Sequence, residues 1–142
     1  MSAIYTEIEI NASAEKVWTI LTEIEKYSEW NPFIVKGSGK AELGSKLNNV
    51  IINDGKEFTF KPTVTKSTPG KEFEWLGHLF FPGLFDGRHY FQIEKRGEGK
   101  VLLRHGERFK GILKGIILSK IKEDTQKGFE SMNKALKERA ES

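Results

Sequence analysis

Three ionisable side chains stand out between residues 75 and 113, where they alternate with large apolar residues. They are His89, His105 and Glu107. In an extended strand, residues i, i+2 and i+4 point to the same face. His105 and Glu107 therefore share one face of a predicted strand, and His89 lies among aromatic residues on the preceding strand. The pattern predicts a mostly apolar cavity with a few polar groups on its wall.

His89 and Glu107 are the candidate pair for proton chemistry, because neighbouring antiparallel strands could bring their side chains within hydrogen-bonding distance. The pKa of a carboxyl group in an apolar wall is raised by desolvation or lowered by an imidazolium partner, and either state serves proton transfer. The alternative is a structural or ligand-orienting pair that satisfies two buried polar groups. We favour the structural or ligand-orienting role for His89 and Glu107. The sequence assigns no catalytic residue, and these two are the candidates.

The same residue types argue against a metal or a cofactor. The three histidines and the scattered carboxylates lack a metal-ligand spacing such as HExxH, and the absence of cysteine excludes thiolate ligands. The glycines do not form a phosphate-binding loop between a strand and a helix. We therefore predict no metal and no cofactor. His78 alternates with Trp75 and is expected on the outer surface.

Length and charge limit the class of protein. The 142 residues fit one domain, residues 1–142. The net charge of +3 arises from 23 basic and 20 acidic residues without a basic stripe, so no nucleic-acid partner is expected. The N-terminus lacks the pattern of a signal peptide, and no run reaches the ~18 apolar residues of a membrane span. These observations predict a cytoplasmic protein without stable membrane insertion.

Residue periodicity predicts an α+β fold with an antiparallel sheet. Residues 4–10 alternate as a strand, Ser13 is placed to cap a following helix, and a second short helix ends before Pro32. Turn residues then separate five predicted strands, at residues 47–52, 57–66, 72–80, 87–94 and 101–110. A helical stripe covers residues 116–139, which is long enough to cross a whole sheet.

Two segments resemble a known superfamily. The opening strand with INASAEKVWTILTEIEKYSEWNPFI, and later WLGHLFFPGLFDGRHYFQIE with ERFKGIL, are similar to the START-like, Bet v 1-type (SRPBCC) superfamily and to its bacterial polyketide cyclase/dehydrase-like branch. The resemblance covers residues 4–136. It implies a helix-grip fold, in which a strongly curved antiparallel sheet of about seven strands wraps around a long C-terminal helix, with two short helices after the first strand. It implies no particular catalytic residue.

The resemblance also implies an apolar cavity between the sheet and the C-terminal helix. Matching strand and helix faces to that cavity gives the expected ligand-binding positions: Phe73, Trp75, Leu79, His89, Phe91, Leu103, His105, Glu107, Phe109, Ile121, Thr125 and Phe129. We expect a small hydrophobic ligand, lipid-like or aromatic, as the partner. The alternatives are a polyketide cyclase/dehydratase-like enzyme that uses His89 and Glu107 as acid and base, and a co-chaperone-like interaction module.

Two turn regions are unusually apolar. Residues 80–85 form one, and residues 112–113 with 116–118 form the other. They could border the cavity entrance and contact a membrane or a partner protein during ligand exchange. The favoured alternative is that they pack against each other at one end of the fold.

Overall fold

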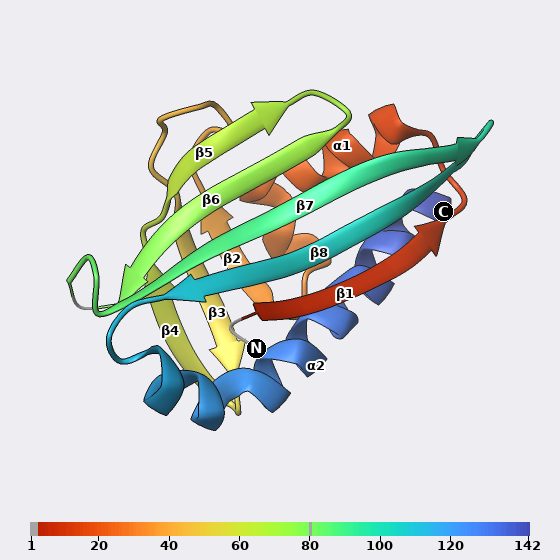
Figure 1. Ribbon diagram of the computed structural model, residues 1–142. Helices are drawn as coiled ribbons and strands as arrows, with labels where there is room; N and C mark the ends of the chain where they lie inside the picture. The colour runs from red at the N-terminus through yellow and green to blue at the C-terminus, as the bar shows by residue number, and fades with distance from the viewer. Residues whose placement is uncertain (1–2, 80) are drawn as a thin grey trace.

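Two antiparallel sheets form the β part of the fold (Figure 1). The larger has the strand order β1-β8-β7-β6-β5 and the smaller the order β2-β3-β4. The larger contains β1 (Ala3–Ile10), β5 (Thr63–Thr68), β6 (Glu72–Leu79), β7 (Phe85–Gly97) and β8 (Lys100–Lys110). The smaller contains β2 (Ile34–Ser38), β3 (Asn48–Asn53) and β4 (Lys56–Phe60). This computed structural model describes residues 3–79 and 81–142.

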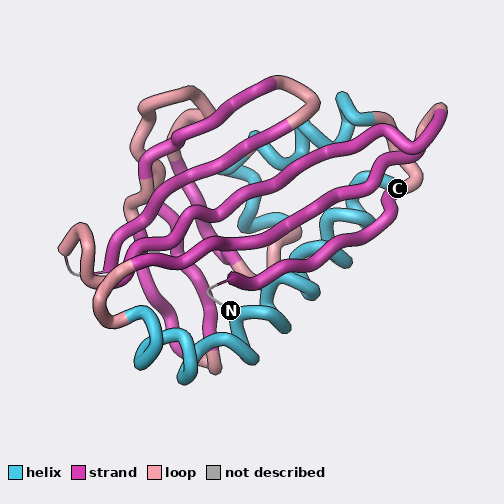
Figure 2. The backbone as a smooth tube through the Cα atoms, viewed as in Figure 1, coloured by secondary structure: helices cyan, strands magenta, loops and turns pink. Residues whose placement is uncertain are grey.

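The helices follow the predicted order. The first is α1 (Ala14–Thr22), where Ser13 Oγ accepts a hydrogen bond from the backbone N–H of Lys16 at 3.1 Å. A 3₁₀ helix, η1 (Ile24–Glu29), follows and ends ahead of Pro32. The last helix, α2 (Lys114–Glu141), has 28 residues and is about 42 Å long. It runs along one side of the larger sheet, as Figure 2 shows.

The α+β class and the helix-grip arrangement are confirmed, but the sheet differs in detail from the prediction. The described residues form eight strands in two sheets, not about seven in one. The predicted strand at residues 57–66 is wrong as a single element, because it divides at Pro62 into β4 and β5. Proline has no N–H for the ladder and disturbs the residue before it. Between the two sheets, an isolated bridge joins Lys46 and Thr63.

The core lies between the larger sheet and α2. One stripe of α2 is buried, with Leu118, Phe129 and Leu136 on it. Gly128 lies on the same helix, where a Cβ would overlap the Phe33 ring. Its missing side chain lets Phe33 pack edge-on against Phe129, with 5.5 Å between the ring centroids. This contact brings the segment that leads into β2 against the long helix.

Candidate functional site

A cavity of about 160 Å³ lies between the two sheets and the first half of α2. Most of its wall is apolar, and the polar exceptions are two asparagines, a threonine, two histidines and one glutamate. The lining residues are Phe33, Asn49, Ile51, Asn53, Phe58, Phe60, Pro62, Trp75, Gly77, His78, Leu79, Phe85, Gly87, His89, Glu107, Phe109, Ile117, Ile121 and Thr125. A few polar atoms in an apolar wall are typical of small-molecule sites.

Glu107 and His89 form the polar end of this cavity. They are directly opposite each other in the β7–β8 ladder, and Glu107 Oε1 lies 3.6 Å from His89 Nδ1. That separation is longer than a hydrogen bond. The Glu107 side chain is 18% exposed, and it borders the cavity. Gly87 lies beside it, and a Cβ at Gly87 would overlap Glu107 Oε2. The glycine therefore makes room for the carboxyl group.

A buried hydrogen-bond chain continues behind His89. Its Nε2 lies 2.7 Å from His105 Nε2, and His105 Nδ1 lies 2.7 Å from Asn133 Oδ1. Asn133 Nδ2 donates to Thr6 Oγ1 at 2.8 Å, and Thr6 Oγ1 donates to the backbone carbonyl of His105 at 2.7 Å. We call His89, His105, Asn133 and Thr6 the polar relay. It crosses the core from β7 to α2 and β1.

Aromatic rings hold the two imidazoles in place. The Trp75 ring stacks on His89 with 4.7 Å between centroids. The Phe129 ring stacks on His105 at 4.2 Å and an interplanar angle of 9°. Apolar packing on these faces removes water from both histidines. Burial consequently lowers the pKa of His89 to about 3. Burial, and then the neighbouring His89, lower the pKa of His105 well below its ordinary value.

Burial has the opposite effect on Glu107, because it disfavours the charged form of any group. It raises the pKa of Glu107 from 4.5 to about 8. Of the two possibilities that the sequence left open for this carboxyl group, desolvation is therefore the one that dominates. At neutral pH the pair consists mainly of a protonated acid and a neutral imidazole.

Comparison with known proteins identifies the family. Residues 1–141 match the family described as "Polyketide cyclase / dehydrase and lipid transport". The chain belongs to this family. Membership confirms the predicted START-like, Bet v 1-type superfamily and its polyketide cyclase-like branch. No match was found among curated proteins.

Solved structures of this superfamily share the fold at low sequence identity. A START superfamily protein from Mycobacterium smegmatis is 23% identical, with a TM-score of 0.76 and coverage of 98% of this chain and 97% of that one. An aromatase/cyclase from Streptomyces sp. R1128 is 13% identical, with a TM-score of 0.77 and coverage of 98% and 93%. Norcoclaurine synthase from Thalictrum flavum, in complex with dopamine and hydroxybenzaldehyde, is 12% identical, with a TM-score of 0.73 and coverage of 96% and 84%. These likenesses establish the fold.

In this family member the expected ligand-binding positions fall into two groups. One group borders the cavity: Trp75, Leu79, His89, Glu107, Phe109, Ile121 and Thr125. The other group lies in the solid core and does not line the cavity: Phe73, Phe91, Leu103, His105 and Phe129. His105 still reaches the site indirectly through its hydrogen bond to His89. The inward strand faces are longer than the cavity, so face matching alone selects too many residues.

The smaller sheet supplies wall residues that the sequence analysis missed. Ile51, Phe58 and Phe60 line the cavity from β3 and β4. The alternation of Phe58 and Phe60 was the available signal, because both lie on one face of a strand. Across the cavity, Asn53 Nδ2 donates to Thr125 Oγ1 at 2.7 Å, which joins β3 to α2. Asn49 also borders the cavity, and its buried Oδ1 has no hydrogen-bond partner among the described residues.

His78 lies at the rim of the cavity. Its side chain is 37% exposed, and its Nδ1 lies 2.8 Å from Asp86 Oδ1 on the neighbouring strand. This exposed hydrogen bond agrees with the expected position on the surface. His78 nevertheless contributes to the cavity lining, which the sequence did not indicate. Among residues 3–79 and 81–142, no cluster of metal-binding side chains is found.

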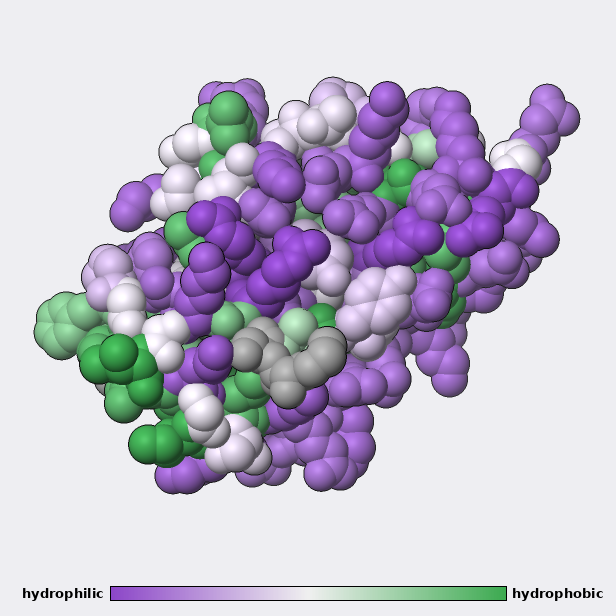
Figure 3. Space-filling model, in the orientation of Figure 1, coloured by the Kyte–Doolittle hydropathy of each residue, from purple (hydrophilic) through white to green (hydrophobic). Residues whose placement is uncertain are grey.

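The two apolar turn regions meet at one end of the molecule. Backbone hydrogen bonds join Ile112 N–H to Gly83 O at 3.1 Å and Leu113 N–H to Leu84 O at 2.9 Å. The expectation that these regions pack together therefore holds for their backbones, and Phe80 lies outside the described residues. Phe81, Ile112 and Ile116 stay exposed, and Figure 3 shows hydrophobic surface at the end where α2 begins. No helix in the described part of the chain is long and apolar enough to span a membrane.

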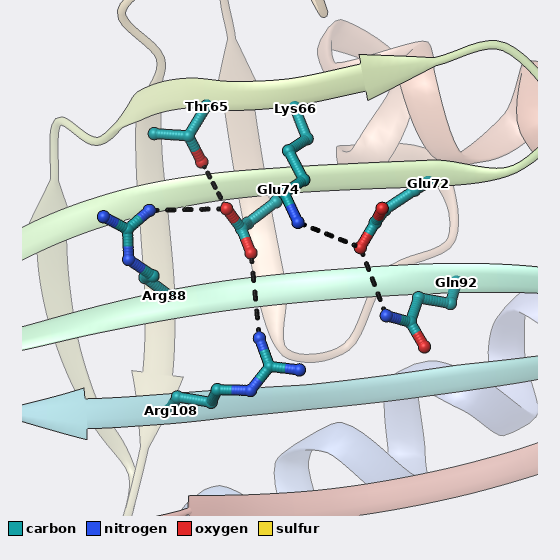
Figure 4. Close-up of polar contacts among 7 residues, drawn as sticks. All are labelled: Thr65, Lys66, Glu72, Glu74, Arg88, Gln92 and Arg108. Carbon is teal, nitrogen blue, oxygen red and sulfur yellow. Dashed lines mark hydrogen bonds and ion pairs between the residues drawn. The ribbon is translucent and has the colours of Figure 1, made fainter.

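The outer face of the larger sheet holds another glutamate that is withdrawn from solvent. Glu74 is only 2% exposed and accepts a hydrogen bond from Thr65 Oγ1 at 2.7 Å (Figure 4). Arg88 and Arg108 approach its two oxygens at 3.4 and 3.9 Å. The Arg108 guanidinium also lies over the Tyr90 ring, 4.4 Å from its centroid. This cluster faces away from α2 and the cavity.

Proposed function

We propose that this protein binds a small hydrophobic ligand, about the size of one aromatic ring, in the cavity, with a polar group of the ligand beside Glu107. The observation that carries the proposal is the cavity itself, about 160 Å³ with a mostly apolar wall. An apolar cavity of roughly 150 Å³ accommodates one benzene molecule. That volume supports the aromatic form of the expected ligand over the lipid-like form.

The comparisons support a binding role at the level of the family, which includes lipid transport as well as cyclase and dehydrase chemistry. One solved structure of the same fold holds dopamine and hydroxybenzaldehyde, both of which contain a single ring. The open cavity also favours binding over the interaction-module alternative, for which we expect side chains to fill that space. A cytoplasmic location stays a prediction from the sequence.

Tryptophan fluorescence and native mass spectrometry test the proposal. Trp75 borders the cavity and stacks on His89, so an aromatic ligand should change its emission. Ile121→Phe should fill part of the cavity and weaken ligand binding by at least about tenfold. Ile116→Phe is the matched control, because Ile116 lies on the same helix but is 63% exposed and outside the cavity. Equal effects of the two substitutions would contradict ligand binding in this cavity.

A second candidate function is catalysis, and one observation favours it. A protonated carboxyl group beside an imidazole in an apolar cavity is a suitable general acid for cyclisation or dehydration. Glu107 and His89 are close together and border the cavity, as an enzyme requires. Within this pair, Glu107 with a pKa of about 8 titrates near neutrality, whereas the pKa of His89 is about 3. Turnover that depends on Glu107 but not on the charge of His89 would support this candidate.

A further inference from the structure

The donor and the acceptor of each hydrogen bond in the polar relay can be assigned from the last acceptor, the backbone carbonyl of His105. A backbone carbonyl only accepts, so Thr6 Oγ1 donates its single hydrogen to His105 O over 2.7 Å. Thr6 must then accept from Asn133, and only the Nδ2 of Asn133 can donate. The amide oxygen of Asn133 therefore faces His105 Nδ1, as the 2.7 Å contact shows.

This orientation assigns the hydrogen on each imidazole ring. Because Asn133 Oδ1 only accepts, His105 carries its hydrogen on Nδ1. A neutral His105 then accepts at Nε2, so the 2.7 Å contact between the histidines is a donation from His89 Nε2. The remaining nitrogen of His89 is Nδ1. It holds a bare lone pair, and it is the atom that faces Glu107.

A lone pair facing a carboxyl group favours the protonated acid over the carboxylate. No lysine or arginine among the described residues of the cavity wall opposes this preference. Among the described lining residues the only titratable groups are His78, His89 and Glu107, without lysine, arginine or aspartate. Trp75 and Gly77 of β6, Gly87 of β7 and Ile121 and Thr125 of α2 contribute no charge, and His78 is paired with Asp86 at the rim.

The Glu107 proton is also available to a ligand. The 3.6 Å between Glu107 Oε1 and His89 Nδ1 is too long for a hydrogen bond. No hydrogen bond to the Glu107 carboxyl group occurs within residues 3–79 and 81–142. A donor without a partner on an apolar wall gains most from a ligand that brings an acceptor.

We propose that Glu107 meets the ligand as a hydrogen-bond donor, so that the cavity selects single-ring compounds with a neutral acceptor, such as a carbonyl oxygen, over amines and carboxylates of similar shape. This inference rests on the proposed binding function. An ammonium group needs a carboxylate partner, which the relay disfavours. A ligand carboxylate would place an anion against a wall without a cation.

Three compounds of similar shape test the inference: acetophenone, ethylbenzene and α-methylbenzylamine. At about pH 6.5 the wild-type protein should bind acetophenone about tenfold more tightly than ethylbenzene, the upper range for one hydrogen bond, and bind the amine most weakly. Above about pH 9, where Glu107 has lost its proton, the preference for acetophenone should disappear. Glu107→Gln keeps a neutral donor and should retain the preference at both pH values. Glu107→Leu should bind acetophenone and ethylbenzene equally.

Thr6→Val tests the direction of the relay. Without the hydroxyl group Asn133 can turn its amide, donate to His105 Nδ1 and reverse the hydrogens on both rings, so that His89 Nδ1 donates to Glu107. In Thr6→Val, the pH at which the acetophenone preference is lost should then be lower than in the wild type by at least about one pH unit. Thr6→Ser keeps the hydroxyl group and should lose the preference at the same pH as the wild type. A purely structural role for Thr6 would lower stability without moving this pH.

The outcomes separate the two proposals. If none of the three compounds binds, the proposed function fails. If ethylbenzene binds as tightly as acetophenone, or the amine binds best at about pH 6.5, the binding function stands and the donor role of Glu107 is refuted. An unchanged pH midpoint in a folded Thr6→Val variant refutes the role of the relay.

Discussion

Glu74 and Glu107 are both withdrawn from solvent in the larger sheet, but their surroundings differ completely. Glu74 on the outer face is held by a threonine hydroxyl and lies beside two guanidinium groups. Glu107 on the inner face has the Nδ1 atom of His89 3.6 Å from its carboxyl group, at the edge of an apolar cavity. In the outer cluster, two guanidinium groups and a hydroxyl donor surround the carboxyl group of Glu74. At the inner site, burial favours the neutral, protonated form of Glu107.

Burial alone does not decide what a carboxyl group does. Arg88 and Arg108 are 45% and 55% exposed, so water also solvates the charges that face Glu74. The relay behind Glu107 is closed to water, since His89 and His105 are almost fully buried. Substitutions on the two faces should therefore differ in size and in their dependence on pH and salt.

The largest effect is expected at Asn133. Asn133→Leu keeps the approximate volume but removes the acceptor of His105 Nδ1 and the donor to Thr6. The loss of the only acceptor of His105 Nδ1 and of one of the two hydrogen bonds of Thr6 should lower the free energy of unfolding by about 2–4 kcal/mol. Urea denaturation followed by circular dichroism measures this loss. A loss below about 1 kcal/mol would mean that the relay contributes no more than a surface contact.

Glu107→Gln should show the next largest effect, as a change in the pH dependence of stability. Between its unfolded pKa of 4.5 and its folded pKa of about 8, the folded protein holds a proton that the unfolded chain releases. Over this range the stability of the wild type relative to Glu107→Gln should therefore fall by about 1 kcal/mol per pH unit as pH rises. Urea titrations from about pH 5 to about pH 8 compare the two proteins. Parallel stability curves would contradict the raised pKa of Glu107.

His89 and His105 act in the opposite direction in both proteins. Their folded pKa values are lowered, so the stability they contribute is present above their ordinary pKa of 6.5 and is lost as pH falls through the acidic range. The wild type should consequently be most stable near pH 6.5. The difference between wild type and Glu107→Gln cancels the histidine contribution, provided that the folded structure is the same.

A smaller effect is expected at the outer carboxylate. Glu74→Ala removes the partner of Arg88 and Arg108, but both guanidinium groups can turn to water. The free energy of unfolding should fall by about 1 kcal/mol, and the loss should be smaller in about 0.5 M salt than in about 0.05 M. Unfolding measured at the two salt concentrations tests this. A salt-independent loss above about 3 kcal/mol would show that the outer cluster is as tightly coupled as the inner relay.

The smallest effect is expected for Thr65→Val. It removes the hydrogen bond from Thr65 Oγ1 to Glu74, while both arginines remain. The expected loss is about 0.5–1 kcal/mol, without a change in ligand binding. Thermal unfolding and the acetophenone titration together check it. A change in ligand affinity would contradict the separation of the two faces.

Much of the fold follows from local sequence patterns. The Ser13 cap, the turn glycines and the stripe that ends at Leu136 depend on neighbours within a few residues, and the elements they predict are present. The pairing of His89 with Glu107 was also predictable, because a hairpin sets the register of its own strands.

The rest of the site depends on contacts between distant segments. Thr6 and Asn133 are 127 positions apart, and only the packing of β1 against α2 joins them. Nothing near either residue indicates a role in the site. The wall from β3 and β4 was missed because it depends on how the chain folds back after the break at Pro62.

That break has an evolutionary consequence. The relay and Glu107 belong to the larger sheet and α2, whereas Ile51, Phe58 and Phe60 reach the cavity from the smaller sheet. Substitutions in β3 or β4 can reshape the cavity without shifting the register of the strands that carry the acid. Selection can therefore change the shape of the cavity without changing the strands that hold Glu107 and His89.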